Sequence, residues 1–157
     1  MAHIPVNHPL RPLYRLFAAL IGLYVLIFGV LGVIETSEHP LFARESTWVL
    51  GLRTNLAFAL ASVVFGAIII FGALHRGNLG HYMSLTIGAI FMVTGLAMMA
   101  VLQTSANFLN FSMSTVIISL IFGLLFLATG LYDKVGSPED AHAENHYRHR
   151  PAPSHRR

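Results

Sequence analysis

The chain contains no cysteine, so neither a disulfide nor a thiolate metal site can form. Charged residues are scarce as well. They make up 11% of the 157 residues, whereas soluble domains carry about a quarter. Hydrophobic residues make up 55%, and the mean hydropathy is +0.64. This balance argues against a soluble domain and indicates a membrane protein. The net charge of +3 does not indicate nucleic-acid binding, because the basic residues lie beside expected helix ends and in a tail.

Four long apolar runs occupy most of the chain. The first carries no charge from Leu16 to Ile34, about the length with which a helix crosses a hydrocarbon core of ~30 Å. We therefore expect an all-α, polytopic membrane protein. Its four transmembrane helices are expected over residues 13–34, 54–74, 82–102 and 113–132. An N-terminal segment, residues 1–12, precedes this domain, and a polar tail rich in histidine and arginine follows it, residues 133–157.

The connection between the first two helices, residues 35–53, has signals of its own. Ser46 or Thr47 is suited to cap a helix that begins early and runs into the second span. Arg53 would then lie inside that helix and extend towards the headgroups. Trp48 is the only tryptophan and favours the membrane–water interface. Glu35 and Arg53 are expected to pair at the outer helix ends, with at most about 1 kcal/mol of stabilisation.

The distribution of lysine and arginine predicts the orientation. Placing both termini in the cytoplasm puts eight of the ten basic residues inside and leaves only Arg44 and Arg53 outside. Since cytoplasmic segments carry the excess of basic residues, we expect a multi-pass protein of a bacterial plasma membrane with both termini cytoplasmic.

Glycines recur at a fixed spacing in three of the spans. The pairs lie seven residues apart, nearly two helical turns, so each pair shares one helix face. Small residues let helix backbones approach closely in lipid, so these faces are expected to be packing faces. The motifs also repeat, with an offset of 66 residues between helices 1 and 3 and of 57 between helices 2 and 4. Two parallel helical-hairpin repeats would give this pattern, and chance recurrence is the alternative. The expected packing residues are Gly22, Gly29, Gly88, Gly95, Gly123 and Gly130.

Candidate chemistry is sparse between the expected helix ends. No Asp, Glu, Lys or His lies there, although proton-coupled transport and haem ligation in a bilayer use such groups. Core packing or lipid contact explains Met92, Met98 and Met99 better than haem ligation does. In the tail, His142, His146 and His149 would share one helix face, but a solvated or partner-bound segment explains them better than a metal site. We expect no catalytic residue, metal or cofactor, whereas bound lipids such as cardiolipin are compatible with the sequence.

Three stretches resemble a known group of proteins. They are HPLRPLYRLFAALIGLYVLIFGVLG at residues 8–32, ARESTWVLGLRTN at 43–55 and FGLLFLATGLYDKVG at 122–136. They are similar to small actinobacterial four-helix membrane proteins, namely the mycobacterial respiratory supercomplex association factors. The resemblance implies a non-catalytic accessory subunit that accompanies the cytochrome bc–cytochrome aa3 oxidase assembly in the respiratory chain. It implies no site residues.

Several functions remain open at this stage. The first is the accessory subunit, which would pack against respiratory-complex subunits through its glycine-lined faces and contact anionic phospholipid. The expected contact residues are Trp48, Arg53, Tyr147, Arg148 and Arg150. The alternative is a small transporter or channel component in which Asn55, Thr86 and Thr94 line a path. A membrane enzyme is the weakest interpretation, because no nucleophile–base pair or metal cluster is evident.

Overall fold

The computed structural model describes residues 8–75, 77–137 and 139–140, and in this part the chain forms four helices and one short β-hairpin. The elements are α1 (Arg11–Thr36), β1 (Trp48–Val49), β2 (Leu52–Arg53), α2 (Leu56–Leu74), α3 (Leu79–Val101) and α4 (Met113–Tyr132). All four described helices are long and apolar enough to cross a membrane. The expected all-α, four-helix fold is therefore confirmed, and the chain is a multi-pass membrane protein.

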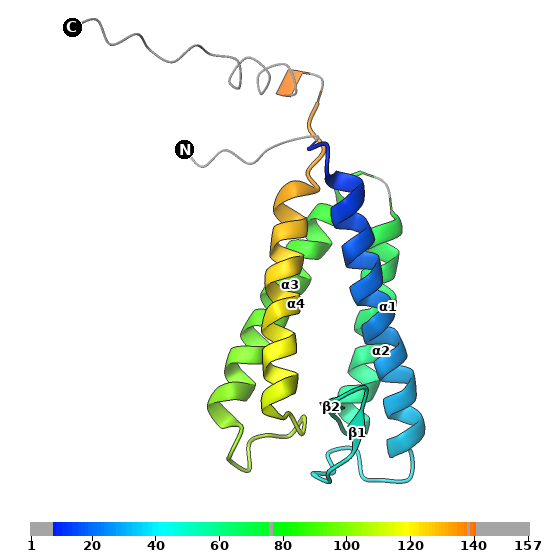
Figure 1. The fold of residues 1–157 in the computed structure, drawn as a ribbon, viewed down its shortest axis with the longest axis vertical. Coiled ribbons are helices and arrows are strands. Elements are labelled where there is room, and N and C mark those ends of the chain that lie inside the picture. Colours follow the sequence, from blue (N-terminus) through cyan, green and yellow to red (C-terminus); the bar gives the residue numbers. More distant parts are fainter. Residues whose placement is uncertain (1–7, 76, 138, 141–157) are drawn as a thin grey trace, which may run out of the picture.

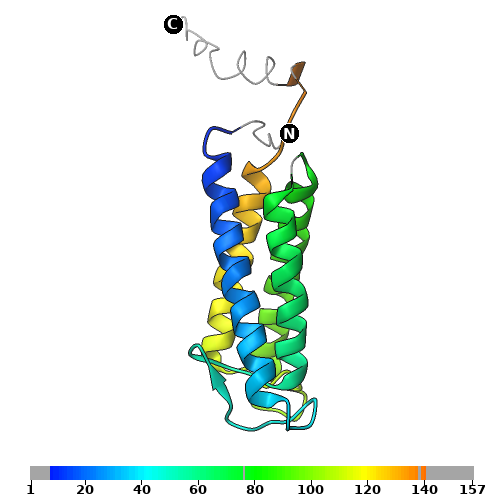
Figure 2. The same ribbon diagram turned by 90° about the vertical axis from the view of Figure 1, so that its right-hand side faces the viewer.

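The helices form two hairpins. α1 packs mainly on α2 and α3 mainly on α4, and the two pairs make fewer contacts with each other. Figures 1 and 2 show the first residues of α1 and the last of α4 at one end of the bundle, which we call the terminal end. The β-hairpin and the connection between α3 and α4 lie at the other end, the loop end. The pairs diverge towards the loop end (Figure 1).

Capping side chains set two of the helix starts. The Asn55 side chain accepts a hydrogen bond from the Phe58 amide at the start of α2. Ser112 and Thr115 form a reciprocal capping box at the start of α4. Such caps satisfy amides that have no partner within the helix. The expected bounds of helix 4 are confirmed, helix 1 is longer than expected by two residues at each end, and helix 3 begins at Leu79 instead of residue 82.

The expected early start of the second helix is wrong. Residues 48–53 form a β-hairpin in which Trp48 pairs with Arg53 and Val49 with Leu52. Its two turn residues, Leu50 and Gly51, both have positive φ, as the tightest hairpin turns require. Val49 and Leu52 are buried against Phe28 of α1. The hairpin thus covers the apolar loop end of α1, and neither Ser46 nor Thr47 begins a helix.

Asparagines join the two connections at the loop end. Asn55 donates to the carbonyls of Ala43 and Phe108 at 3.3 and 2.8 Å. Asn110 donates to the carbonyls of Glu45 and Thr54 at 2.7 and 2.9 Å. Each asparagine therefore satisfies backbone carbonyls of residues that lie outside the helices and strands.

The expected ion pair between Glu35 and Arg53 does not form. Arg53 instead donates to the backbone carbonyls of Arg44 and Glu45, at 3.1 and 3.4 Å. The β-hairpin is the physical reason, because it places Arg53 on a strand beside residues 44–45 and not on the second helix.

Candidate functional site

The six expected glycines lie where helices of the same chain cross. A Cβ added at Gly29 would lie 2.5 Å from the Val63 amide nitrogen, and one at Gly88 would lie 2.8 Å from the Leu127 nitrogen. A Cβ added at any of the other four would lie 2.6 to 2.9 Å from a side chain of the partner helix. The contacts are Ile69 for Gly22, Leu120 for Gly95, Met92 for Gly123 and Leu85 for Gly130. Each glycine thus packs one helix against its hairpin partner. The glycine faces hold this chain together and are not available to another subunit.

The contacts of the two hairpins repeat with the offsets of the sequence motifs. Gly66 packs on Leu26, and Gly123 packs on Met92. Met92 lies 66 residues after Leu26, and Gly123 lies 57 after Gly66. The helix crossings therefore share one register, as a duplicated hairpin predicts.

An ion pair closes the terminal end of the bundle. The Arg11 Nε donates to the Asp133 carboxylate at 2.6 Å, and its Nη2 donates to the Gly77 carbonyl at 3.0 Å. The Asp133 side chain is 2% exposed, whereas that of Arg11 is 23% exposed. A Cβ at Gly80 would lie 2.6 Å from the carboxylate, so this glycine makes room for it. The pair links α1 to the end of α4 and to the connection between α2 and α3.

Two further side chains at this end occupy equivalent places in the repeat. Arg15 donates from Nε to the Ala73 carbonyl at 2.9 Å, and the Nδ1 of His81 lies 2.5 Å from the Gly130 carbonyl. Because a carbonyl only accepts, this Nδ1 carries the hydrogen. His81 lies 66 residues after Arg15, and Gly130 lies 57 after Ala73. Each hairpin therefore ties its second helix to its first by a side-chain donor to a carbonyl that the helix end leaves unpaired.

His81 and Asp133 were missed as site residues. The expected start of helix 3 at residue 82 left His81 outside the span, but it lies inside α3 and is 4% exposed. The expectation that no histidine lies within a span is therefore wrong. Asp133 was expected to be the first residue of the tail, but its backbone amide donates to the Thr129 carbonyl of α4. The available signal was Gly80 next to His81, since a glycine in a helical pattern often marks a close approach.

A groove between α1 and α2 combines both arginines with apolar residues. It has a volume of about 380 Å³ at the terminal end. Its lining consists of Arg11, Pro12, Arg15, Leu16, Ala19, Ala73 and Leu74. Charged donors at its polar rim and alkyl groups below them match the two parts of a phospholipid.

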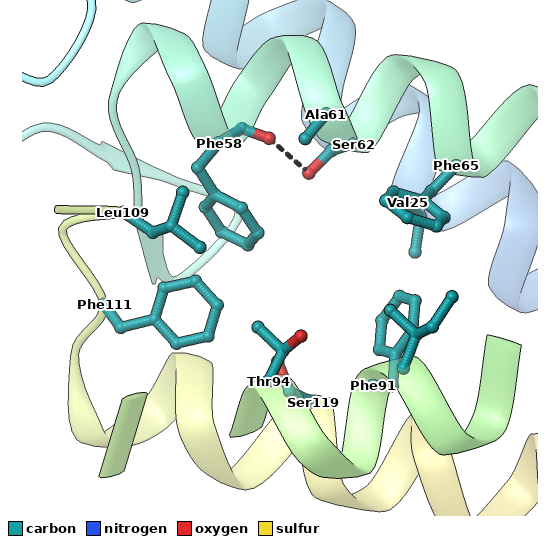
Figure 3. Close-up of a pocket in the computed structure, with 11 residues that line it drawn as sticks. Val25, Phe58, Ala61, Ser62, Phe65, Phe91, Thr94, Leu109, Phe111 and Ser119 are labelled. Atoms are coloured by element: carbon teal, nitrogen blue, oxygen red, sulfur yellow. Dashed lines mark hydrogen bonds between the residues drawn. The ribbon is translucent and has the colours of Figure 1, made fainter. Parts of the chain in front are cut away.

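A second space lies between the two hairpins. It has a volume of about 140 Å³, and all four helices or their loop-end connections contribute to its wall. Figure 3 shows phenylalanine side chains around it, with Ser62 on one wall and Thr94 and Ser119 on the opposite one. We call it the central cavity. Its lining consists of Val25, Phe58, Ala61, Ser62, Phe65, Ile90, Phe91, Thr94, Leu109, Phe111 and Ser119.

The polar residues expected to line a transport path are not brought together. Asn55 is a helix cap with 1% exposure, and Thr94 lines the central cavity. Thr86 lies in a separate groove on the surface of α2 and α3. Of the methionines, Met98 is in the core and Met99 is 45% exposed on the outside of α3, and the expectation of core packing or lipid contact covers both positions.

The expected contact residues fall into two groups. Trp48 is 55% exposed at the loop end, where an interfacial tryptophan is favoured, and Arg53 is held by carbonyls beside it. Tyr147, Arg148 and Arg150 lie outside the described residues, as do His142, His146 and His149. Among the residues that are described, no group of three or more His, Asp or Glu side chains gathers to hold a metal ion.

Comparison with known proteins identifies a family. Residues 15–132 match the family described as "Domain of unknown function (DUF4383)". The matched region begins in the first turns of α1 and ends with the last residue of α4, so it contains both hairpins. No curated protein and no solved structure matches the chain significantly. The chain belongs to the DUF4383 family of domains of unknown function.

Proposed function

We propose that the chain is a non-catalytic accessory subunit of a respiratory supercomplex, which associates with the cytochrome bc complex, the cytochrome aa3 oxidase or both in a bacterial plasma membrane. The resemblance of residues 8–32, 43–55 and 122–136 to actinobacterial association factors suggests the partner. The geometry supports a scaffold whose helices are joined to one another by polar contacts and whose outer surface is apolar.

The observation that carries this proposal is how the polar side chains of the bundle are used. Arg11, Asp133, Arg15 and His81 join helix ends at the terminal end. Asparagines join the connections at the loop end. These contacts fix the relative positions of helices and leave the outer faces for lipid and partner. Such use of polar groups is typical of a structural subunit.

The partner surface is expected on faces that the glycines do not occupy. α1 exposes an apolar stripe at helical spacing, formed by Leu16, Leu20, Leu23 and Ile27. At the loop end, Phe42 and Phe108 stack edge to face, each about half exposed. Exposed apolar and aromatic side chains of this kind are suited to contact with lipid or with a partner subunit.

Anionic phospholipid is the proposed lipid partner. The groove of Arg11 and Arg15 supports this, since its arginines face the headgroup depth and its alkyl lining continues towards the hydrocarbon. Because Arg11 is paired with Asp133, Arg15 supplies the uncompensated positive charge for the headgroup of an anionic lipid such as cardiolipin.

Co-purification tests the proposed function. We expect the tagged chain, extracted in mild detergent, to retain a-, b- and c-type cytochrome spectra at stoichiometric levels. A chain truncated after residue 140 keeps the described bundle, and we expect it to insert normally but retain less of the complex. Because exposed charge contacts are screened over ~8 Å at physiological ionic strength, a lipid-mediated role for the tail predicts a difference between the truncated and full-length chains at low salt that disappears at high salt, whereas a tail docked on protein predicts a difference at both. A full-length chain that purifies without any cytochrome contradicts the proposal.

Both termini are proposed to be cytoplasmic. Ser105, between α3 and α4, and Ser137, after α4, are both exposed, so a cysteine at either position is open to a membrane-impermeant thiol reagent. We expect labelling from outside intact cells at Ser105→Cys and not at Ser137→Cys. The native chain is a clean background, because it has no cysteine. Labelling of Ser137→Cys from outside would reverse the proposed orientation.

A further inference from the structure

The central cavity has the size and lining of a site for a small apolar group. A dry cavity of about 150 Å³ lined by apolar side chains is large enough to bind benzene, and this one measures about 140 Å³. Four phenylalanines contribute to its wall, which suits a flat ring: Phe58, Phe65, Phe91 and Phe111. Ser62 and Ser119 of its wall lie next to the crossings of Gly29 and Gly95, respectively.

The hydroxyl groups in this wall differ in whether they form a hydrogen bond within the chain. The Ser62 hydroxyl donates to the Phe58 carbonyl at 2.8 Å, as Figure 3 shows. Ser119 lies 57 residues later, at the equivalent place in the second hairpin, and is only 7% exposed. No hydrogen bond joins the hydroxyl of Ser119 or Thr94 to any of the described residues. No fully buried side-chain oxygen or nitrogen of the described residues lacks a partner, so these two hydroxyls keep accessible surface and can be reached by a ligand.

Two residues of the cavity wall also line a groove on the outside of the bundle. Phe65 of α2 and Ile90 of α3 line the central cavity and also a groove of about 300 Å³ on the outside of the same two helices. The groove is apolar and continues along Ile68, Met83 and Ile87. These two side chains therefore contact both the cavity and the groove. A ligand with its head in the cavity has room for an apolar tail in the groove.

We propose that the central cavity binds a membrane-soluble molecule with a ring-sized apolar head and one hydrogen-bond-accepting oxygen, a ketone-type carbonyl, to which Thr94 and Ser119 donate. The phenylalanines contact the ring, and the two hydroxyls select the carbonyl over a hydrocarbon of the same shape. This site does not depend on the respiratory role proposed above, because it follows from the cavity and its unpaired hydroxyls alone.

A matched pair of ligands tests the site in the purified full-length chain. 4′-Fluoroacetophenone has a carbonyl, and 1-ethyl-4-fluorobenzene has nearly the same shape without one. ¹⁹F NMR titration gives the affinity of each, corrected for partition into empty detergent micelles. A neutral hydrogen bond contributes roughly 0.5–1.5 kcal/mol, so we expect the ketone to bind about 2- to 12-fold more tightly than the hydrocarbon.

Single substitutions in the cavity wall test which hydroxyl groups cause the preference for the ketone. Ser119→Ala and Thr94→Val should each reduce the ketone-to-hydrocarbon ratio towards one. Ser62→Ala is the matched control, because it removes a hydroxyl from the same cavity that is already bonded to Phe58. It should leave the ratio unchanged. Ala61→Phe should fill the space and weaken both ligands.

Three results would overturn the inference. They are a wild-type chain that binds neither ligand saturably, one that binds both equally, or a ketone preference that persists in both hydroxyl variants. The first two need no variant, so a substitution that prevents folding does not remove the test.

Discussion

Gly29→Ala is expected to destabilise the bundle far more than Gly95→Ala, although the two glycines occupy equivalent places in the repeat. The added methyl group at Gly29 would meet only backbone, at 2.5 Å from the Val63 nitrogen and 2.9 Å from the Ala59 oxygen. α1 and α2 would have to separate to admit it. At Gly95 the nearest atom is the Leu120 Cδ2 at 2.9 Å, which a change of rotamer can move.

The expected costs follow from this difference. Overpacking that shifts backbone costs about 1–3 kcal/mol or more, whereas a rotamer change costs of order 1 kcal/mol. We expect Gly29→Ala to lose about 3 kcal/mol and Gly95→Ala at most about 1 kcal/mol. The measurement is reversible unfolding in mixed micelles for both variants. Ala67→Leu is the control, because Ala67 is exposed next to Gly66 and should tolerate a larger side chain. Equal losses of stability at Gly29 and Gly95 would contradict this prediction. They would show that the cost does not depend on whether the contacted atom belongs to backbone or to a side chain that can move.

Hydropathy alone predicted the four spans because a bilayer imposes one length and one composition on every crossing helix. The uncharged run from Leu16 to Ile34 is sufficient for α1, and the bounds of α4 were predicted to the residue. The glycine period also predicted which residues share a packing face. It could not tell whether that face meets the same chain or another subunit, since both environments favour small residues. The contacts of Gly66 and Gly123 settle this in favour of the same chain.

The segments outside the spans were harder to predict because tertiary contacts decide them. Residues 48–53 have apolar side chains that fit the start of an amphipathic helix equally well. Their β-hairpin depends on the positive φ of Leu50, which is unfavourable for a leucine, and on the burial of Val49 against Phe28. No local sequence pattern predicts the contact between Val49 and Phe28.

The central cavity could not be predicted from the sequence either. Ser62, Thr94 and Ser119 are polar residues of the spans, for which hydrogen bonds to neighbouring carbonyls are the usual role. That role is found for Ser62 and not for the other two. The distinction requires side-chain positions on three helices, which periodicity cannot supply.

Removal of the Asp133 carboxylate is expected to be the most damaging change at the terminal end. Asp133→Ala would leave the Arg11 guanidinium with only carbonyl partners among the described residues, and the Asp133 site itself is almost fully enclosed. Breaking a fully buried pair costs about 3–5 kcal/mol. Since Arg11 is 23% exposed, water offsets part of this, and we expect a loss of about 2 kcal/mol.

The control for this prediction is a contact between two exposed side chains. His39 and Glu45 lie 3.2 Å apart at the loop end, but both side chains are exposed. Glu45→Gln should change stability by less than about 0.5 kcal/mol. In the double variant Arg11→Met, Asp133→Ala no charge remains unpaired, so stability should recover relative to Asp133→Ala alone. If Asp133→Ala costs no more than Glu45→Gln, or if Arg11→Met adds a full independent loss, then the pair does not hold α1 to α4.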